Sequence, residues 1–380
     1  MRPLIVMHVL PEYRLPALEA LKVRYPDARV IVSDGGAWAS GQNAANIADL
    51  ADVTVLPARV RRIAGVSLVF FPGLRSAVKA SGADVLLMDP RMGLLSIWSL
   101  AVWPPKVDGR RVSTVWWFAG WRNRERARYI SVVAEALQRQ VIRRADGAAC
   151  YSSAAQRTAI SLGIPASRAV LAQNATATSA LEEAFDAQVP PARHDDSLHL
   201  LYVGRVEERK RLDAVLVAMS APALAGRCLL RVVGSGPATQ GLRAVAHARG
   251  VDTSLEIVDG THDPFEIARH LRWADVGILP NQGGLFLNTA MSCGVPVVCG
   301  RADGTEEDLV LDGVTGWRLS GPNADEIEAR LLSLLTHRDD VALAGVRARE
   351  RFHETATLDH MVNGIEEALR RAATGRRGVE

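Results

Sequence analysis

The chain has 380 residues, of which 48% are hydrophobic and 23% are charged. These values are typical of a globular α/β protein with two domains or three small ones, and no apolar run of about 18 residues occurs, which excludes a membrane-spanning helix. The net charge of +3 combines a basic part, residues 1–185 with +9, and an acidic remainder with −6. A basic half suits anionic lipid, a phosphorylated acceptor or nucleic acid, although scattered charges more often mark a solvated surface.

The cysteines and the N-terminus indicate a cytoplasmic protein. The four cysteines lie in apolar contexts without the spacing of a metal site, so buried, reduced thiols are expected at Cys150, Cys228, Cys293 and Cys299. The first segment, MRPLIVMHVL, has too short an apolar core for a signal peptide and is expected to be a buried strand.

In the first half, short apolar strands alternate with helices. Strands are expected at 4–9, 28–33, 53–56, 66–71, 83–88, 113–117, 148–151 and 169–172, and helices at 15–23, 94–103, 124–144 and 154–162. Pro16 suits the first turn of its helix, and the pair Ser152-Ser153 suits an N-cap. Such alternation predicts a parallel sheet with helices on both faces.

A composition change follows at 188–197, QVPPARHDDS, which is polar, lacks apolar periodicity and is interpreted as a linker. A second alternating series then predicts another parallel sheet. Its strands are expected at 198–203, 228–233, 255–258, 276–279, 295–299 and 317–319, and its helices at 212–219, 240–248, 264–273, 287–292, 324–335 and 340–352.

The predicted fold is therefore α/β, with two Rossmann-like, doubly wound domains facing across a cleft. The first domain is assigned to residues 1–187 and the second to 198–355. A last helix at 358–372 lies within the segment 356–380, which is a candidate to pack back on the first domain.

The most informative stretch runs from Trp273 to Gly316. A strand at 276–279, a glycine-bearing loop, a short helix and the strand at 295–299 form a parallel crossover unit. The loop of such a unit lies at the carboxyl end of the sheet, where ligands of these folds bind. We therefore expect the site at this edge.

Two motifs of the second half suit a phosphate-bearing ligand. Gly204-Arg205 ends a strand, and Lys210 follows five residues after the arginine, in a chain with only four lysines against 41 arginines. Such a loop supplies backbone N–H groups and two cations to a diphosphate, although a solvated turn is the simpler alternative. The turn Gly234 to Pro237 lets a backbone approach a phosphate or base closely, although an ordinary strand-to-helix connection explains it equally.

A third motif suits sugar hydroxyls. The loop Asn281 to Leu285 contains two glycines whose exposed N–H groups suit an anion. Asn281, Asn288 and Thr289 add neutral hydrogen-bonding groups.

Together these motifs resemble the retaining glycosyltransferases of the two-Rossmann-domain (GT-B) type, family 4. In that family a glycine-arginine pair precedes a lysine by the spacing seen at Gly204, Arg205 and Lys210. Further matches are Gly234 to Gly236, Ala274-Asp275 to Pro280, Gly284-Leu285, Ala290-Met291, Gly294 to Val297 and Asp312 to Gly316. The resemblance is specific over residues 198–320 and rests on architecture elsewhere.

The resemblance implies a nucleotide-sugar donor in the second domain, with UDP- or GDP-sugars expected, and an acceptor in the first. Arg205 and Lys210 would act catalytically by neutralising the leaving diphosphate, with no metal and no other cofactor. The implied donor-binding residues are Gly204, Gly234, Gly236, Pro237, His262, Asn281, Gly283, Gly284, Leu285, Asn288 and Thr289.

The sequence departs from the family pattern at three positions. The family commonly has two glutamates in the central stretch, and Asn281 and Thr289 stand in their register. Neither residue can ionise. The histidine that the family has after the strand at 113–117 is also missing, because the loop there is Phe118-Ala119-Gly120.

Acceptor-binding residues are expected along the edge of the first domain. Aromatic faces suit sugar rings, and arginines suit a lipid-linked phosphate or an anionic membrane. The candidates are Tyr13, Arg14, Asp89, Arg91 and Trp121. We expect a saccharide or lipid-linked acceptor, in polysaccharide, glycolipid or other glycoconjugate synthesis, and a cytoplasmic protein that visits the inner face of the membrane.

Other functions remain open. Asn281 and Thr289 also fit a non-catalytic nucleotide-sugar sensor or partner subunit. A nucleotide-sugar epimerase would need further carboxylates in the cleft, and a phosphorylase is disfavoured by the few lysines. A nucleic-acid-binding role is disfavoured because the basic residues form neither a dense run nor a known motif.

Overall fold

The computed structural model describes residues 1–34, 52–63, 66–91, 93–120, 128–192, 196–282 and 284–374. By its internal contacts the chain divides into two compact units. The first unit consists of Met1–Asn174 with Leu358–Glu380, and the second of Ala175–Thr357.

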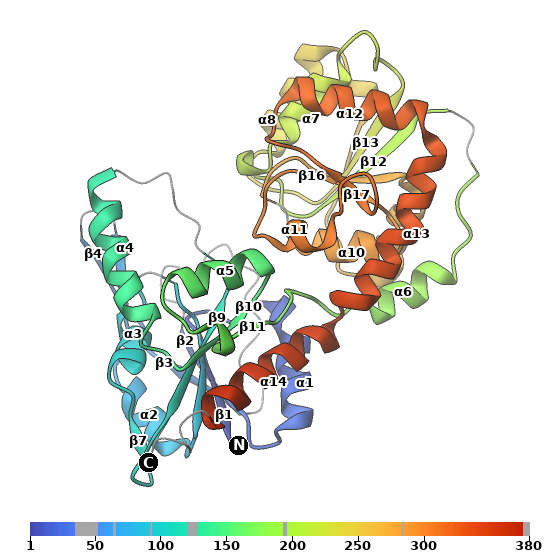
Figure 1. Ribbon diagram of the computed structural model, residues 1–380. Coiled ribbons are helices and arrows are strands. Elements are labelled where there is room, and N and C mark those ends of the chain that lie inside the picture. The colour runs from blue at the N-terminus through green and yellow to red at the C-terminus, as the bar shows by residue number, and fades with distance from the viewer. Residues whose placement is uncertain are drawn as a thin grey trace. The chain divides into compact units, whose positions relative to one another are not determined.

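The first unit is built on a seven-stranded parallel sheet with the strand order β11-β10-β9-β6-β1-β2-β3 (Figure 1). Most of its strands consist of buried residues, as expected for a parallel sheet covered on both faces. The strands are β1 (Pro3–Val6), β2 (Arg29–Ser33), β3 (Val53–Leu56), β6 (Val85–Met88), β9 (Ser113–Phe118), β10 (Gly147–Cys150) and β11 (Ala169–Leu171).

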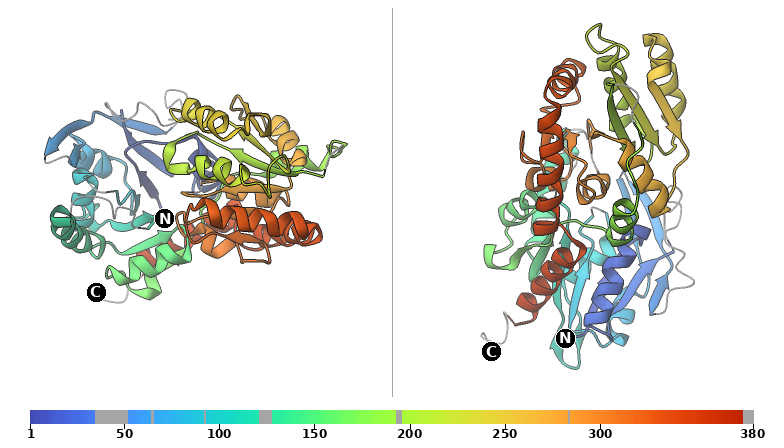
Figure 2. Two further views of the ribbon diagram at one scale, coloured as in Figure 1. Left: turned by 90° about the horizontal axis from the view of Figure 1, so that it is seen from above. Right: turned by 90° about the vertical axis from the view of Figure 1, so that its right-hand side faces the viewer.

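Helices cover both faces of this sheet (Figure 2). They are α1 (Leu15–Arg24), α2 (Leu74–Ala80), α3 (Leu95–Val102), α4 (Arg128–Ile142), α5 (Ser153–Ser161) and α14 (Leu358–Thr374), with 3-10 turns η1 (Glu12–Arg14) and η4 (Ala166–Arg168). The predicted N-cap is confirmed, because the Ser152 hydroxyl accepts a hydrogen bond from the amide of Ala155 at 3.1 Å.

Two antiparallel hairpins complete the first unit. One pairs β4 (Arg59–Ile63) with β5 (Val66–Phe70), and the other pairs β7 (Lys106–Val107) with β8 (Arg110–Arg111). The basic segment at 59–62, which the sequence analysis leaves between strands, is thus itself a strand.

The second unit has a six-stranded parallel sheet with the order β14-β13-β12-β15-β16-β17. Its strands are β12 (Leu198–Val203), β13 (Cys228–Val233), β14 (Leu255–Val258), β15 (Val276–Leu279), β16 (Val297–Cys299) and β17 (Gly316–Arg318). Its helices are α6 (Ser179–Asp186), α7 (Leu212–Met219), α8 (Thr239–Arg249), α9 (Pro264–Trp273), α10 (Phe286–Ser292), α11 (Thr305–Leu309), α12 (Ala324–Thr336) and α13 (Arg338–Thr355), and two 3-10 turns are η5 (Glu208–Lys210) and η6 (Asp252–Ser254).

The chain passes from the first unit to the second after Asn174, before the segment 188–197 that the sequence analysis assigns to the linker. The reason is α6, which packs against α9. The guanidinium of Arg272 on α9 lies 3.5 Å from the ring centroid of Phe185 and donates a hydrogen bond to the Phe185 carbonyl at 2.8 Å. Residues 175–187 therefore belong to the second unit.

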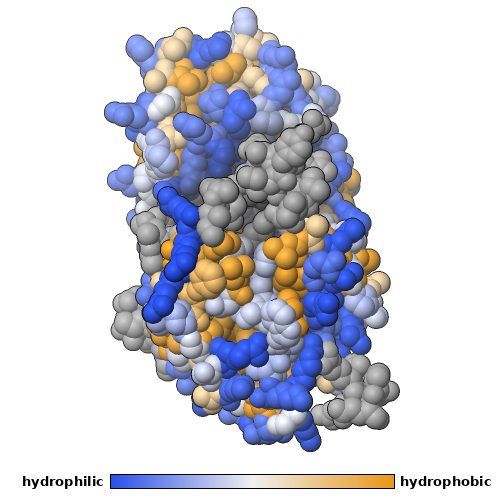
Figure 3. Space-filling view, turned by 90° about the vertical axis from the view of Figure 1, so that its left-hand side faces the viewer, coloured by the Kyte–Doolittle hydropathy of each residue, from blue (hydrophilic) through white to orange (hydrophobic). Residues whose placement is uncertain are grey.

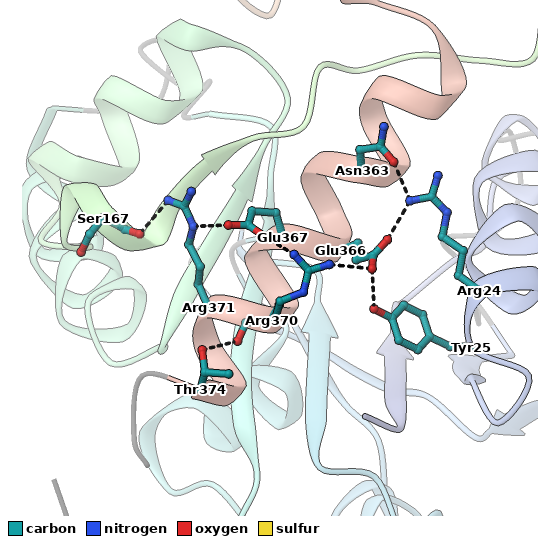
Figure 4. Close-up of polar contacts among 9 residues, drawn as sticks. All are labelled: Arg24, Tyr25, Ser167, Asn363, Glu366, Glu367, Arg370, Arg371 and Thr374. Carbon is teal, nitrogen blue, oxygen red and sulfur yellow. Dashed lines mark hydrogen bonds and ion pairs between the residues drawn. The ribbon is translucent and has the colours of Figure 1, made fainter. Parts of the chain in front are cut away.

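The C-terminal helix α14 belongs to the first unit, where it packs against α1, β9, β10 and β11. Its Glu366 accepts hydrogen bonds from Arg24 at 2.8 Å, from Tyr25 at 3.1 Å and from Arg370 at 2.7 Å (Figure 4). On the other side of the helix, Arg371 donates to the carbonyl of Ser167. The last helix thus joins α1, near the start of the chain, to η4, which directly precedes β11.

Two further sequence expectations concern burial and the membrane. The four cysteines are buried and unbridged, as predicted, and burial raises the pKa of each thiol to about 12. Among the described helices, none is both long and apolar enough to cross a bilayer.

Candidate functional site

The sheet of the second unit changes winding direction between β12 and β15. Strands β13 and β14 follow β12 toward one edge, and β16 and β17 follow β15 toward the other. The loops after β12 and β15 therefore leave the sheet at its topological switch point, where open α/β sheets bind ligands. These two loops carry Arg205, Lys210 and the segment 280–285.

The loop after β12 is fixed against the turn after β13. A Cβ atom at Gly234 would lie 2.1 Å from the carbonyl oxygen of Gly204, and one at Gly236 would lie 2.2 Å from that of Val206. The amide of Val206 also donates to the carbonyl of Ser235 at 3.0 Å. The two glycines are therefore required for contact between backbones, whatever else they bind, and they bring the two predicted phosphate motifs together.

Tyr202, on strand β12, stabilises the same loop. Its hydroxyl donates to the carbonyl of Arg205 at 2.9 Å, and its ring packs edge-on against Phe286. Burial raises the pKa of this phenol, so Tyr202 stays a neutral donor. Nothing in the sequence indicates this role, since Tyr202 occupies an ordinary strand position.

The loop after β12 is also joined to the loop after β15. Lys210 donates from its ammonium group to the backbone carbonyl of Gln282, and Arg209 donates to the Gln282 side chain at 3.1 Å. The Asn281 amide in turn donates to the carbonyl of Arg209 at 2.9 Å. The predicted residues Lys210 and Asn281 thus lie in one cluster, which Arg209 and Gln282, missed by the sequence analysis, hold together.

Two residues of these loops, one in the cluster and one beside it, have left-handed backbone conformations that favour glycine. Gln282 has φ 44° and Arg211, which follows Lys210, has φ 57°. Strain of this kind is concentrated at functional sites.

Glu207 is the acidic member of the cluster and was not singled out from the sequence. Its carboxylate lies 3.3 Å from Nε of Arg205 and also pairs with Arg209. Since Arg205 is half exposed, this ion pair contributes little to stability, and Arg205 can exchange it for a contact with a more strongly charged anion.

The remaining residues that were predicted to bind the nucleotide sugar lie on the helix α10 or just before it. Thr289 is half-buried and its hydroxyl donates to the carbonyl of Leu285 at 3.1 Å, whereas Asn288 is 1% exposed. Gly284 is exposed, and a Cβ atom there would meet nothing within 4 Å. Gly283 lies outside the described residues.

Pro237 and His262 are both exposed, in the loops after β13 and β14. These loops are neighbours, because a Cβ atom at Gly260 would lie 3.4 Å from the Cα atom of Gly234. Every described residue that was predicted to bind the nucleotide sugar and that precedes α10 therefore lies in one of the loops after β12, β13, β14 and β15.

The first unit has a second switch point, between β1 and β6. Asp89, just after β6, is 8% exposed and accepts a hydrogen bond from Nε of Arg91 at 2.5 Å. Burial disfavours the charged form of Arg91. The charge of Asp89 and its hydrogen bond outweigh that effect, so the pKa of Arg91 is raised. Tyr13 and Arg14, after β1, lie at the same edge, and Trp121 lies outside the described residues.

Comparisons with known proteins identify the second unit. Residues 185–358 match the family described as glycosyl transferases group 1. Over this region the chain is similar to the group 1 glycosyl transferases. The resemblance that residues 198–320 predict is thereby confirmed.

The curated relatives of the chain include mycobacterial enzymes. It is 32% identical over 160 residues to the GDP-mannose-dependent alpha-(1-6)-phosphatidylinositol monomannoside mannosyltransferase of Mycolicibacterium smegmatis, covering 39% of this chain and 41% of the relative. It is 30% identical over 191 residues to the D-inositol 3-phosphate glycosyltransferase of Mycobacterium avium, covering 47% and 44%. The chain thus matches less than half the length of these relatives.

Solved structures support the fold of the whole chain. HepE of Anabaena, in complex with UDP, superposes with a TM-score of 0.72 at 16% identity, covering 97% of this chain and 100% of that one. At this identity the similarity shows the fold alone. The predicted fold class, with two Rossmann-like domains of the GT-B type, is confirmed.

Proposed function

We propose that the protein is a glycosyltransferase that moves a sugar from a nucleotide-diphosphate sugar to an acceptor hydroxyl. The observation that carries this proposal is the cluster at the switch point of the second sheet. There Arg205 and Lys210 lie beside backbone turns that are already fixed to one another. Preorganised cations of this kind stabilise a leaving diphosphate without reorganising during the reaction.

The reaction proceeds with retention and without a metal. The bond between the anomeric carbon and the diphosphate oxygen breaks, and its electron pair stays with the diphosphate. The acceptor oxygen bonds to the anomeric carbon, and its proton leaves to a phosphate oxygen or to solvent. Arg205 and Lys210 neutralise the charge that develops on the diphosphate, so they contribute most in the transition state.

UDP- and GDP-sugars are the donors to test first. The base and ribose would lie against the turn at Gly234 to Pro237 and near His262, and the exposed Gly284 offers its amide to the sugar or phosphate. At Asn281 and Thr289 the donor meets hydrogen-bonding groups without charge.

One observation favours a second candidate, a nucleotide-sugar-binding partner or sensor without activity. Asn281 and Thr289 are neutral, and both donate to carbonyls of their own chain. Another GT-B enzyme, such as a nucleotide-sugar epimerase, would use the same diphosphate cations.

A thermal-shift screen separates these functions. UDP, GDP, ADP, TDP, CMP and their common sugar conjugates are added to the wild type, to Lys210→Ala and to Lys79→Ala, which removes an exposed lysine of α2. One diphosphate should stabilise the wild type and the control but not Lys210→Ala, and its sugar conjugate should be turned over with an acceptor. Nucleotide binding without turnover over a broad acceptor panel would favour the sensor.

The first unit would hold a saccharide or lipid-linked acceptor at the inner face of an anionic membrane. The β4–β5 hairpin supports this proposal, because Arg59, Arg61 and Arg62 are exposed on β4 and Phe70 is 37% exposed on β5. Figure 3, which views the side of Figure 1 where β4 and α4 lie, shows apolar and hydrophilic residues intermixed on this face. Flotation with anionic liposomes without salt-sensitive binding would contradict it.

A further inference from the structure

Arg14 is a buried cation between aromatic rings at the carboxyl edge of the first sheet. It ends the turn η1 after β1 and is 3% exposed. Its guanidinium carbon lies 3.8 Å from the ring centroid of Trp117, 4.6 Å from that of Tyr151 and 5.2 Å from that of Tyr13. Aromatic faces attract a cation, but they do not replace hydrogen-bond acceptors for its N–H groups.

The described residues use only part of the hydrogen-bonding capacity of this cluster, in which a side-chain hydrogen bond joins Arg14 to Tyr13. Nε and Nη1 of Arg14 are buried with no acceptor among them, and so is Nε1 of Trp117, the ring that lies closest. No ion pair joins Arg14 to a carboxylate in the part of the chain that the structure describes. Buried donors without partners are rare and costly, above all on a charged group.

The charges around Arg14 leave an excess of positive charge. Asp89 is the carboxylate whose charge acts on Arg14, and it already accepts hydrogen bonds from the amide and the guanidinium of Arg91. Burial lowers the pKa of Arg14, and Tyr13 and Asp89 offset that effect only in part. One carboxylate is thus shared by two guanidinium groups.

We propose that Arg14 binds an anionic group of the acceptor, a phosphate ester, through Nε and Nη1, with Nε1–H of Trp117 as a further donor. The Nε–Nη1 edge of a guanidinium matches two oxygens of a phosphate, and a tetrahedral phosphate has a further oxygen for a third donor. Both nitrogens are buried, so the anion enters when a covering side chain moves. Tyr13 is 43% exposed and is therefore less confined than Trp117, which is 3% exposed. The inference rests on the proposed transferase function, whose acceptor it defines.

Calorimetric titration of the full chain tests this site without turnover. The probes are inorganic phosphate, glucose 6-phosphate, glucose, glucuronate and a short-chain phosphatidic acid. The proteins are the wild type, Arg14→Met, Lys210→Ala and the control Arg231→Met, which removes an arginine that lies 3.9 Å from the ring centroid of Trp273 in the second unit. A UDP and GDP titration of the same proteins reports separately on the donor site.

Glucose 6-phosphate or phosphatidic acid should bind the wild type more tightly than glucose or glucuronate, and the better of the two shows whether the phosphate is on a soluble or a lipid acceptor. Arg14→Met should weaken that binding by roughly tenfold or more, and Lys210→Ala and Arg231→Met should not. Equal affinity for glucose and its phosphate, or loss of phosphate binding in Lys210→Ala with Arg14→Met unaffected, would overturn the proposal.

Trp117→Phe is the second variant if Arg14→Met does not fold. It keeps an aromatic ring beside Arg14 but removes the Nε1–H donor, so phosphate binding should weaken while the donor nucleotide binds as in the wild type. Unchanged phosphate affinity in this variant would remove Trp117 from the site. If nucleotides bind nowhere but phosphate binding depends on Arg14, the transferase proposal fails and the anion site stands.

Discussion

Lys210 donates a hydrogen bond to the backbone carbonyl of Gln282, a residue 72 positions further along the chain. The bond connects the loops after β12 and β15 across the switch point of the second sheet. An ammonium group has three donors, so Lys210 can keep this bond and still contact a diphosphate. The cation is therefore positioned before any donor arrives, which is the arrangement that electrostatic catalysis needs.

Lys210→Ala should lower the rate of sugar transfer by roughly hundredfold, because one preorganised charge on the leaving group is removed. The free energy of unfolding should change by less than about 1 kcal/mol, since a half-buried side chain that donates to the Gln282 carbonyl is lost. Release of the nucleoside diphosphate measures the rate, and Lys79→Ala should behave as the wild type. A variant as fast as the wild type would exclude Lys210 from the chemistry.

Gly284→Ala should lower the affinity for the nucleotide sugar without changing stability, whereas Gly236→Ala should lower stability. A methyl group at residue 284 meets nothing within 4 Å, so stability should not change, whereas donor affinity should fall if the sugar or phosphate lies against this amide. At residue 236 the methyl group meets the carbonyl of Val206, which should lower stability by roughly 2 kcal/mol and Tm by about 5 °C. Thermal unfolding and nucleotide titration of both variants check this, and an unaffected donor affinity in stable Gly284→Ala would place the donor elsewhere.

The regular parts of the fold are predictable because burial alone decides them. β12, α7, β13, β14 and α9 have the predicted bounds, since each is a short apolar or amphipathic run between clear breaks. By contrast, α6 was missed although Leu181, Ala184 and Phe185 have helical spacing and are buried. Its sequence lies next to the polar segment 188–197, and only the contact with α9 shows to which unit it belongs.

The site is predictable where it depends on local motifs and not where it depends on contacts between loops. The glycines and Lys210 could be found from spacing. Glu207 and Gln282 could not, because their roles arise from the loop after β12 meeting the loop after β15. The unpartnered nitrogens of Arg14 likewise depend on three strands ending at one edge, which no single stretch of sequence contains.

Glu366→Gln should destabilise the first unit at neutral pH. Burial raises the pKa of Glu366, but the hydrogen bonds from Arg24, Tyr25 and Arg370 outweigh it, so the pKa lies below its ordinary value. A lowered folded-state pKa contributes stability that is present above the unfolded value of about 4.3 and is lost as the pH falls through the folded value. The variant should be less stable than the wild type by about 1 kcal/mol at pH 7, a figure reduced by solvent screening, and the difference should shrink below about pH 4.

Thermal unfolding between pH 3 and pH 8 measures this difference. The control is Glu183→Gln, which changes an exposed carboxylate on α6. A difference between wild type and Glu366→Gln that stays constant with pH would show that the loss comes from packing and not from the charge of Glu366.

Arg211 tests whether the loop that carries Lys210 holds backbone strain. With φ 57°, its conformation costs an L-residue with a Cβ atom about 1 kcal/mol and costs glycine almost nothing. Arg211→Gly and Arg211→Ala both lose the exposed ion pair with Asp213, so that loss cancels when the two are compared. The glycine variant should be more stable than the alanine variant by about 1 kcal/mol, which reverses the order found at ordinary helix positions, and denaturant unfolding with both proteins measures it. An alanine variant of equal or higher stability would show that this turn relaxes when Arg211 is replaced, and that the position of Lys210 does not depend on a strained neighbour.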